Sequence, residues 1–299
     1  MEKGAFDMVI LNSIVQYFPD VDYLGQVLKG ALRVLRPGGC LFLGDIRSHS
    51  LLETFHVAAE LLRRTGSGKE NLSQFEKSVQ KNMAAETELT VAPEFFSSFA
   101  RQTEGIEECR IFPKRGQFTN ELNQFRYQVV LTTKKVATKT VASWQNWKQD
   151  NYSLEKLRLQ LESESCEMIA FEHVPNARIA DAVGALAIGE QLEWSGDEMV
   201  SSLESRQDQV EHRNEISLSQ LEDLAGEFGW RFNVSWARHE KDGHWMWSFP
   251  VMKCPSNFDP KIPKADRLRR WPINPPGPAG RPYIQRSFRA FLATSFPNT

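Results

Sequence analysis

The sequence has little of several features that would assign a protein to a class at once. No apolar run among its 299 residues is long enough to span a bilayer, which argues against a membrane protein. The apolar stretch at the start contains Asn12, Ser13 and Gln16, and no small-residue cleavage site follows, so we expect no signal peptide. The net charge of -2 provides no basic field for binding nucleic acid.

The cysteines and histidines give no sign of a disulfide framework or a metal site. The four cysteines are scattered and form no C-x-x-C pair, which favours neither a zinc site nor a disulfide scaffold. The histidines show no metal-ligand spacing with cysteine, aspartate or glutamate. We therefore expect no bound metal and a reducing, cytoplasmic location. What remains is an ordinary globular composition, with 41% apolar and 25% charged residues.

The first part of the chain has the pattern of a parallel α/β sheet. The short apolar run Phe6 to Leu11 is typical of a buried strand, and an amphipathic helix follows from Asp20 to Leu35. Arg36-Pro37-Gly38-Gly39 is a helix stop, and Cys40 to Leu43 reads as the next strand. Strand, helix and strand in this order predict that Phe6–Leu11 and Cys40–Leu43 lie side by side in one sheet.

The rest of the chain divides into further predicted elements. Two strands, Ile106 to Phe112 and Phe125 to Thr132, form an antiparallel pair that can close a sheet edge. The predicted regions are 1–135 for the sheet, 141–254 for a smaller α+β unit with a tryptophan-rich hairpin around Asp242-Gly243, and 255–299 for a proline-rich linker and a short amphipathic helix.

Polar residues follow both predicted parallel strands. In open α/β sheets ligands bind outside the carboxyl ends of the strands, which makes Asn12, Ser13, Gln16 and Tyr17 candidates after the first strand. An equally weighted alternative is that Tyr17 and the next phenylalanine simply cover the end of the sheet.

Asp45 and Arg47 end the second predicted strand. Arg47 could orient a carbonyl-bearing substrate, or it could form a salt bridge on the rim of the sheet. Glu121 could accept a hydrogen bond from a substrate ammonium group, or it could support the turn before the last strand. His49 and His56 follow Arg47, and helix packing is the expected role for both.

Three strings carry a more specific signal. FDMVILNSIVQYFPDVDYL, then ALRVLRPGG-x-LFLGDIRS, then FTNELNQFRYQVVL occur in this order, and together they resemble the N-methyltransferase domain inserted in nonribosomal peptide synthetases. The resemblance covers most of the chain, and it implies part of the class I methyltransferase (Rossmann-like) fold, with 1–135 as the C-terminal half of its core. The end of the chain, after the proline-rich linker of 255–299 begins, resembles the start of an adenylation-domain segment. It also implies S-adenosylmethionine as cofactor and transfer of its methyl group to the α-amine of a carrier-bound aminoacyl group.

The resemblance implies site roles as well. Asn12, Gln16 and Tyr17 would lie near the methyl-transfer region, Asn12 and Ser13 near the cofactor, and Asp45, Arg47 and Glu121 on the substrate side. The glycine-rich turn that holds the cofactor in this family has no counterpart, since Gly66-Ser-Gly68 follows a helix. We therefore expect a fragment that is inactive alone and needs a complementary N-terminal half. The alternatives are a noncatalytic remnant or docking partner, and a generic α/β enzyme such as an oxidoreductase.

Overall fold

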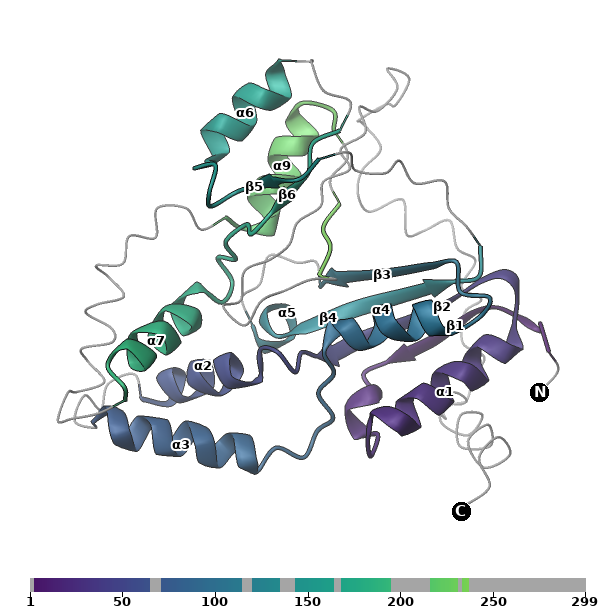
Figure 1. Ribbon diagram of the computed structural model, residues 1–299, viewed down its shortest axis with the longest axis horizontal. Coiled ribbons are helices and arrows are strands. Elements are labelled where there is room, and N and C mark those ends of the chain that lie inside the picture. Colours follow the sequence, from purple (N-terminus) through teal and green to yellow (C-terminus); the bar gives the residue numbers. More distant parts are fainter. Residues whose placement is uncertain are drawn as a thin grey trace, which may run out of the picture.

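The main feature of the computed structural model is a mixed four-stranded sheet (Figure 1). The structure describes residues 3–64, 71–114, 120–134, 143–163, 168–194, 216–230 and 233–236. The sheet has the order β1-β2-β4-β3, and its strands are β1 (Phe6–Asn12), β2 (Leu35–Arg47), β3 (Glu108–Pro113) and β4 (Arg126–Thr132).

Strand pairing confirms the predicted α/β class. β1 and β2 are parallel, with Met8 opposite Cys40 and Leu11 opposite Leu43, so the two predicted strands are neighbours. β4 runs antiparallel to both β2 and β3 and forms the antiparallel pair that the sequence predicted. A sheet with two parallel strands and an antiparallel closing pair agrees with the partial methyltransferase sheet that was expected.

The connection between β1 and β2 follows from local sequence. After the short helix η1 (Val15–Tyr17), the side chain of Asp20 accepts a 2.7 Å hydrogen bond from the Tyr23 amide and caps α1 (Val21–Val34). β2 begins directly at Leu35, five residues earlier than predicted, so the Pro-Gly-Gly segment ends the helix and also belongs to the strand. Gly38 allows this with a left-handed φ of 86°.

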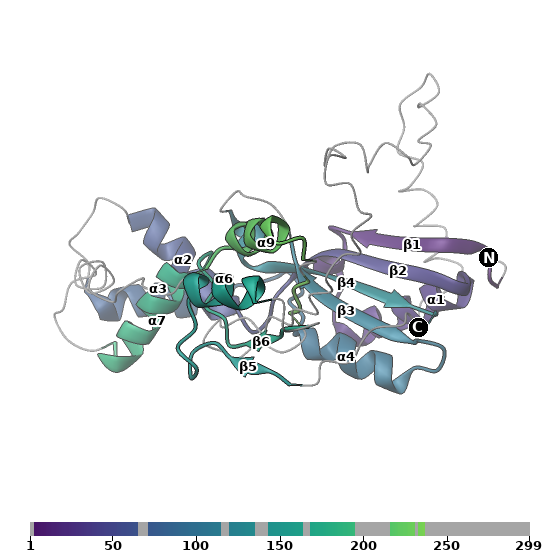
Figure 2. The same ribbon diagram turned by 90° about the horizontal axis from the view of Figure 1, so that it is seen from above.

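Helices cover one face of the sheet. α1 and α4 (Pro93–Gln102) lie on the same side of it in both views (Figures 1 and 2). The opposite face is less covered at β1, where Phe6, Met8 and Ile10 are 42%, 45% and 59% exposed. Within the described residues β1 pairs only with β2, so this apolar strand stands at the sheet edge.

Three further helices gather at the end of the sheet away from the N-terminus (Figures 1 and 2). α2 (Leu52–Arg64), α3 (Leu72–Ala84) and α7 (Ala180–Gln191) share a second buried cluster that includes Val57, Phe75 and Ile188. The Phe75 and Trp194 rings stack with centroids 5.7 Å apart. Helix α7 thus joins elements from far earlier in the chain.

Residues 141–254 were predicted to form a smaller α+β unit, and this region keeps that name here. Besides α7, its described elements are β5 (Gln145–Asn146), α6 (Leu154–Glu162), β6 (Phe171–Glu172) and α9 (Leu218–Glu227), with β5 and β6 parallel. It contacts the main sheet through Trp236, whose amide donates a 2.8 Å hydrogen bond to the Ile111 carbonyl and whose ring meets Tyr127 edge to face. The predicted hairpin around Asp242-Gly243 and the region 255–299 lie outside the described residues.

Candidate functional site

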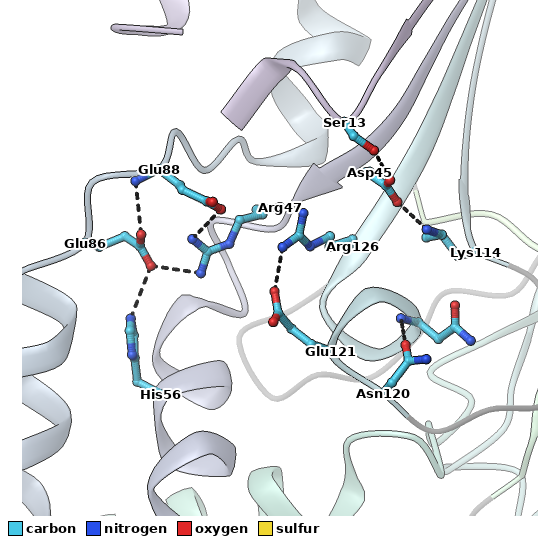
Figure 3. Close-up of polar contacts among 11 residues, drawn as sticks. Ser13, Asp45, Arg47, His56, Glu86, Glu88, Lys114, Asn120, Glu121 and Arg126 are labelled. Atoms are coloured by element: carbon cyan, nitrogen blue, oxygen red, sulfur yellow. Dashed lines mark hydrogen bonds and ion pairs between the residues drawn. The ribbon is translucent and has the colours of Figure 1, made fainter. Parts of the chain in front are cut away.

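The candidate site lies at the edge of the sheet where β1, β2 and β3 have their carboxyl ends (Figure 3). Because β4 is antiparallel, its first residue, Arg126, reaches the same edge. Ser13 follows β1 and Asp45 lies at an irregularity of β2, and both have left-handed backbones with φ of 53° and 60°. Non-glycine residues rarely adopt this conformation, and such strain clusters at functional sites.

A linked polar chain runs across this edge. Asn12 Nδ2 donates to Ser13 Oγ at 3.0 Å, and Ser13 Oγ in turn donates to one carboxylate oxygen of Asp45. Lys114, just after β3, donates from Nζ to the other oxygen (Figure 3). Lys114 was not among the predicted site residues, although it follows the end of β3 just as Ser13 follows the end of β1.

These contacts keep Asp45 ionised. Burial raises the pKa of its carboxyl group, but the hydrogen bonds from Lys114 and Ser13, with the charges of Lys114 and Arg126, outweigh burial and leave the pKa below its usual value. The edge of the sheet therefore presents a carboxylate whose two oxygens both have partners and whose charge is balanced by neighbouring cations.

Gly44 makes room for Asn12. It lies opposite Asn12 in the β1–β2 pairing, and a Cβ atom placed on it would overlap with Asn12 Oδ1. Such a Cβ would also lie 3.0 Å from a ring carbon of Phe42. A glycine at this position thus permits the side chain of Asn12 to lie over the end of β2.

The other predicted residues after β1 point in different directions. Tyr17 is 71% exposed, whereas Gln16 is only 5% exposed. The side-chain oxygen of Gln16 is buried without a hydrogen-bond partner among the described residues, and its backbone carbonyl accepts a 2.8 Å bond from the Leu89 amide. Phe18 is buried and meets Tyr23 edge to face, which accords with the alternative that this residue covers the sheet end.

Arg47 is buried and already paired. Its guanidinium contacts Glu86 at 2.8 Å and Glu88 at 3.1 Å (Figure 3). It also lies 4.9 Å from the centre of the Phe55 ring. Glu86 and Glu88, which precede α4, were not identified from the sequence. The salt bridge foreseen as the alternative role of Arg47 is therefore present.

His56 completes this buried cluster. Its Nε2 lies 3.5 Å from Glu86 Oε2, and only 7% of the residue is exposed. Burial lowers the pKa of His56, and the raising effect of Glu86 does not cancel it. His56 therefore packs in α2 as expected, whereas His49 is exposed and contacts Thr90 at 2.9 Å.

Glu121 starts the short helix α5 (Glu121–Gln124) and pairs with Arg126. The distance between Arg126 Nη2 and Glu121 Oε1 is 2.6 Å, and 45% of the Glu121 side chain remains exposed (Figure 3). Asn120 caps this helix by accepting from the Asn123 amide at 3.1 Å. The structure thus brings Asn12, Ser13, Asp45 and Glu121 to one edge of the sheet, while Arg47 belongs to the neighbouring buried cluster.

In the part of the chain that the structure describes, no group of histidine, cysteine, aspartate or glutamate residues could hold a metal ion. The described helices also include none with the length and apolar character needed to cross a membrane.

Comparison with known proteins identifies relatives. No protein-family model matches the chain. It is 34% identical over 277 residues to chondramide synthase of Chondromyces crocatus, covering 90% of this chain and 6% of that protein. It is 32% identical over 245 residues to cyclosporin synthetase of Tolypocladium inflatum, covering 77% and 2%. The nonribosomal peptide synthetase AsqK of Emericella nidulans is 27% identical over 316 residues, covering 99% and 12%.

One solved structure, a Thermotoga maritima S-adenosylmethionine-dependent methyltransferase described as a possible histamine N-methyltransferase, is 17% identical with a TM-score of 0.27, covering 45% of this chain and 59% of that one. The chain spans 12% or less of the three synthetases named above. By sequence it is homologous to a segment of the nonribosomal peptide synthetases.

Proposed function

We propose that the chain forms part of an S-adenosylmethionine-dependent N-methyltransferase acting on a carrier-bound aminoacyl group in nonribosomal peptide synthesis. The proposal is supported by homology to synthetase segments and by the three strings that resemble the inserted methyltransferase domain. The observation that carries it is the linked chain of Asn12, Ser13, Asp45 and Lys114 at the carboxyl edge of the parallel strands.

Methyl transfer depends mainly on the alignment of the attacking amine. S-adenosylmethionine supplies an electrophilic methyl group, and the attacking amine must be neutral and in line with it. We assign Asn12, Gln16 and Tyr17 to the region of methyl transfer, and Asp45 and Glu121 to the substrate amine as hydrogen-bond acceptors. Arg47 would act indirectly by holding the end of β2, because Glu86 and Glu88 already match its charge.

The described residues fit only part of the cofactor. Asn12 and Ser13 offer polar groups at a strand end, where a nucleoside could bind. The described glycines with left-handed backbones are Gly4, Gly38, Gly105 and Gly229, and none of these follows the carboxyl end of a strand of the main sheet. The methionine end would therefore need residues beyond this set, and we propose that a complementary N-terminal half supplies them.

Reconstitution tests the proposal. The chain would be joined to the N-terminal half of a homologous synthetase methyltransferase segment and supplied with an aminoacyl thioester on a carrier protein. We expect mass spectrometry to detect the gain of one methyl group on the amine. Asp45→Asn and Asn12→Ala should lower kcat/KM by about tenfold or more, since each removes a charged or polar contact.

Ser73→Ala is the matched control, because Ser73 lies in α3, apart from the site. Equal activity in all three variants would remove the site assignment. No methyl transfer by a folded, joined protein would argue against the catalytic function.

The second candidate function is a noncatalytic docking partner. The exposed apolar residues of β1, namely Phe6, Met8 and Ile10, favour it, because a strand edge of this kind invites pairing with another segment. Sedimentation analysis of the wild-type chain and of Ile10→Lys distinguishes this role. Association that the lysine abolishes, without any methyl transfer after reconstitution, would favour docking.

A further inference from the structure

A contact between the α+β unit and the candidate site has no role in the assignments above. Arg178 lies just before α7, and its Nη1 donates hydrogen bonds to two backbone carbonyls of the site edge. These are Lys114 O at 2.7 Å, at the end of β3, and Asn123 O at 3.1 Å, in α5. One side chain therefore holds together two segments that each carry a residue of the site.

The backbone of Arg178 is held in turn. Its amide donates a 3.0 Å hydrogen bond to the side-chain oxygen of Asn176. Its carbonyl accepts a hydrogen bond from Nε2 of Gln124, the last residue of α5. The contacts between Arg178 and α5 therefore run in both directions, and the guanidinium has little freedom to move away from the carbonyls.

The contact of Arg178 with the Lys114 carbonyl also affects the carboxylate of Asp45. Lys114 carries the ammonium group that pairs with Asp45, and the same residue's carbonyl is the acceptor nearest to Arg178. A charged donor on that carbonyl fixes the backbone from which the lysine side chain extends. Charge-assisted hydrogen bonds of this kind are about twice as strong as neutral ones.

We propose that Arg178 is a positioning residue that sets the Lys114–Asp45 pair and thereby couples the α+β unit to the proposed methyl-transfer site. The inference deepens the proposed function and rests on it for its catalytic meaning. Arg178 itself contacts protein carbonyls, so its effect on the reaction passes through Lys114 and through α5.

Chemical labelling of lysines tests the positioning directly on the full chain. In the wild-type protein Lys114 should react slowly with an amine-selective reagent, because its side chain is only 20% exposed and is ion-paired with Asp45. In Arg178→Met we expect mass spectrometry to show severalfold faster labelling of Lys114 relative to Lys29, an exposed residue in α1. Arg178→Lys keeps a cationic donor and should restore part of the protection.

Two further variants separate positioning from general loss of structure. Gln124→Ala removes the reciprocal bond but leaves the guanidinium, and should give a smaller increase in the same direction. Arg158→Met is the matched control, because Arg158 pairs with Glu227 on the surface of the same unit and should leave Lys114 labelling unchanged. Thermal unfolding of each variant shows whether it is folded when labelled.

The reconstituted methyl-transfer assay gives the second readout. Arg178→Met should lower kcat/KM by about tenfold, with partial rescue in Arg178→Lys and no change in Arg158→Met. Unchanged labelling of Lys114 in folded Arg178→Met, or full turnover in that variant, would overturn the inference. Absence of methyl transfer in the wild-type protein would count against the proposed function alone, and the labelling result would then decide this inference.

Discussion

Two residues at the ends of neighbouring strands adopt a backbone conformation that is rare for residues other than glycine. Ser13 and Asp45 both have left-handed φ values, and a hydrogen bond joins their side chains. A strained backbone of this kind costs on the order of 1–3 kcal/mol and persists only where its surroundings hold it. Here the Ser13 amide also donates to the Gly44 carbonyl at 3.2 Å, so backbone and side-chain bonds together keep both residues at the site.

Gly44 and Asn12 offer a test of how tightly this edge is packed. Gly44→Ala should destabilise the protein by about 1–3 kcal/mol, because the new methyl group would overlap with Asn12. In an Asn12→Ala background the same change should cost clearly less, since the overlapping side chain is gone. Chemical denaturation of the four proteins measures this coupling, and additive effects of the two substitutions would contradict it.

His56 makes stability depend on pH. Its pKa in the folded protein lies below the ordinary value of about 6.5, because burial disfavours its charged form and, together with weaker repulsion by Arg47 and Arg63, outweighs the stabilising effect of Glu86. Between the two pKa values the unfolded chain binds more protons, so this contribution to stability is present above pH 6.5 and is lost as the pH falls through the folded pKa.

Denaturation midpoints at pH 7.5 and pH 5.5 check this expectation, at about one unit on either side of the unfolded pKa. The loss of stability at the lower pH should be smaller in His56→Gln than in the wild-type protein. His49→Gln is the control, because His49 is exposed and should leave the loss unchanged. An identical pH dependence in all three proteins would show that His56 does not contribute.

At the scale of elements, helix α6 has one buried side and one exposed side. Leu157 and Leu161 are buried in the same apolar cluster as Trp147 and Phe171, whereas Leu159 on the same helix is 65% exposed. The helix begins at Ser153, whose side chain accepts from the Lys156 amide at 3.2 Å. The apolar side of the helix therefore belongs to the main buried cluster, and the other side faces solvent.

Leucine truncation tests that packing. Leu161→Ala should lower the free energy of unfolding by about 2–5 kcal/mol, as expected for removing a fully buried leucine side chain. Leu159→Ala should change it by less than about 0.5 kcal/mol, because the residue is largely exposed. Urea unfolding gives both values, and similar losses in the two variants would place α6 differently from the structure.

The proposed boundaries at 135, 141 and 254 belong to this scale too. We expect limited proteolysis to cut first between Lys134 and Thr140 and between Pro255 and Pro278. Faster cleavage within the α+β unit, between Trp144 and Val251, would show that these boundaries are wrong. The Trp236 and Arg178 contacts join this unit to Ile111 in β3 and to Lys114 just after it.

At the scale of the whole molecule, the described residues offer contacts to only part of the cofactor, and β1 is an exposed apolar strand that a complementary half could cover. We therefore expect the chain alone to bind S-adenosylmethionine weakly. The absence of two good hydrogen bonds to the methionine end would cost roughly 2–3 kcal/mol, at about 1–1.5 kcal/mol each, which is near a hundredfold in affinity.

Calorimetric titration measures this affinity. The chain joined to a homologous N-terminal half is the control, and it should bind S-adenosylmethionine clearly more tightly than the chain alone. A micromolar dissociation constant for the chain alone would contradict the expectation, and it would show that the edge built from Asn12, Ser13 and Asp45 suffices for binding.

Local pattern alone determined the α/β character of this protein. The apolar run from Phe6 to Leu11 and the helical spacing after Asp20 predicted neighbouring parallel strands, because both signals depend on residues a few positions apart. The rule that ligands bind at strand ends also located Asn12, Ser13 and Asp45 at one edge. The exact start of β2 was missed, since a Pro-Gly-Gly segment ordinarily marks a turn.

Only the tertiary structure decided which charges meet. Lys114 pairs with Asp45 across 69 positions, and Glu86 and Glu88 pair with Arg47, for which the sequence predicted either a substrate contact or a salt bridge but could not name the partners. Arg178 likewise reaches the site from another unit. Periodicity does not encode such pairs, because the path of the chain brings the partners together and short-range sequence spacing carries no record of that path.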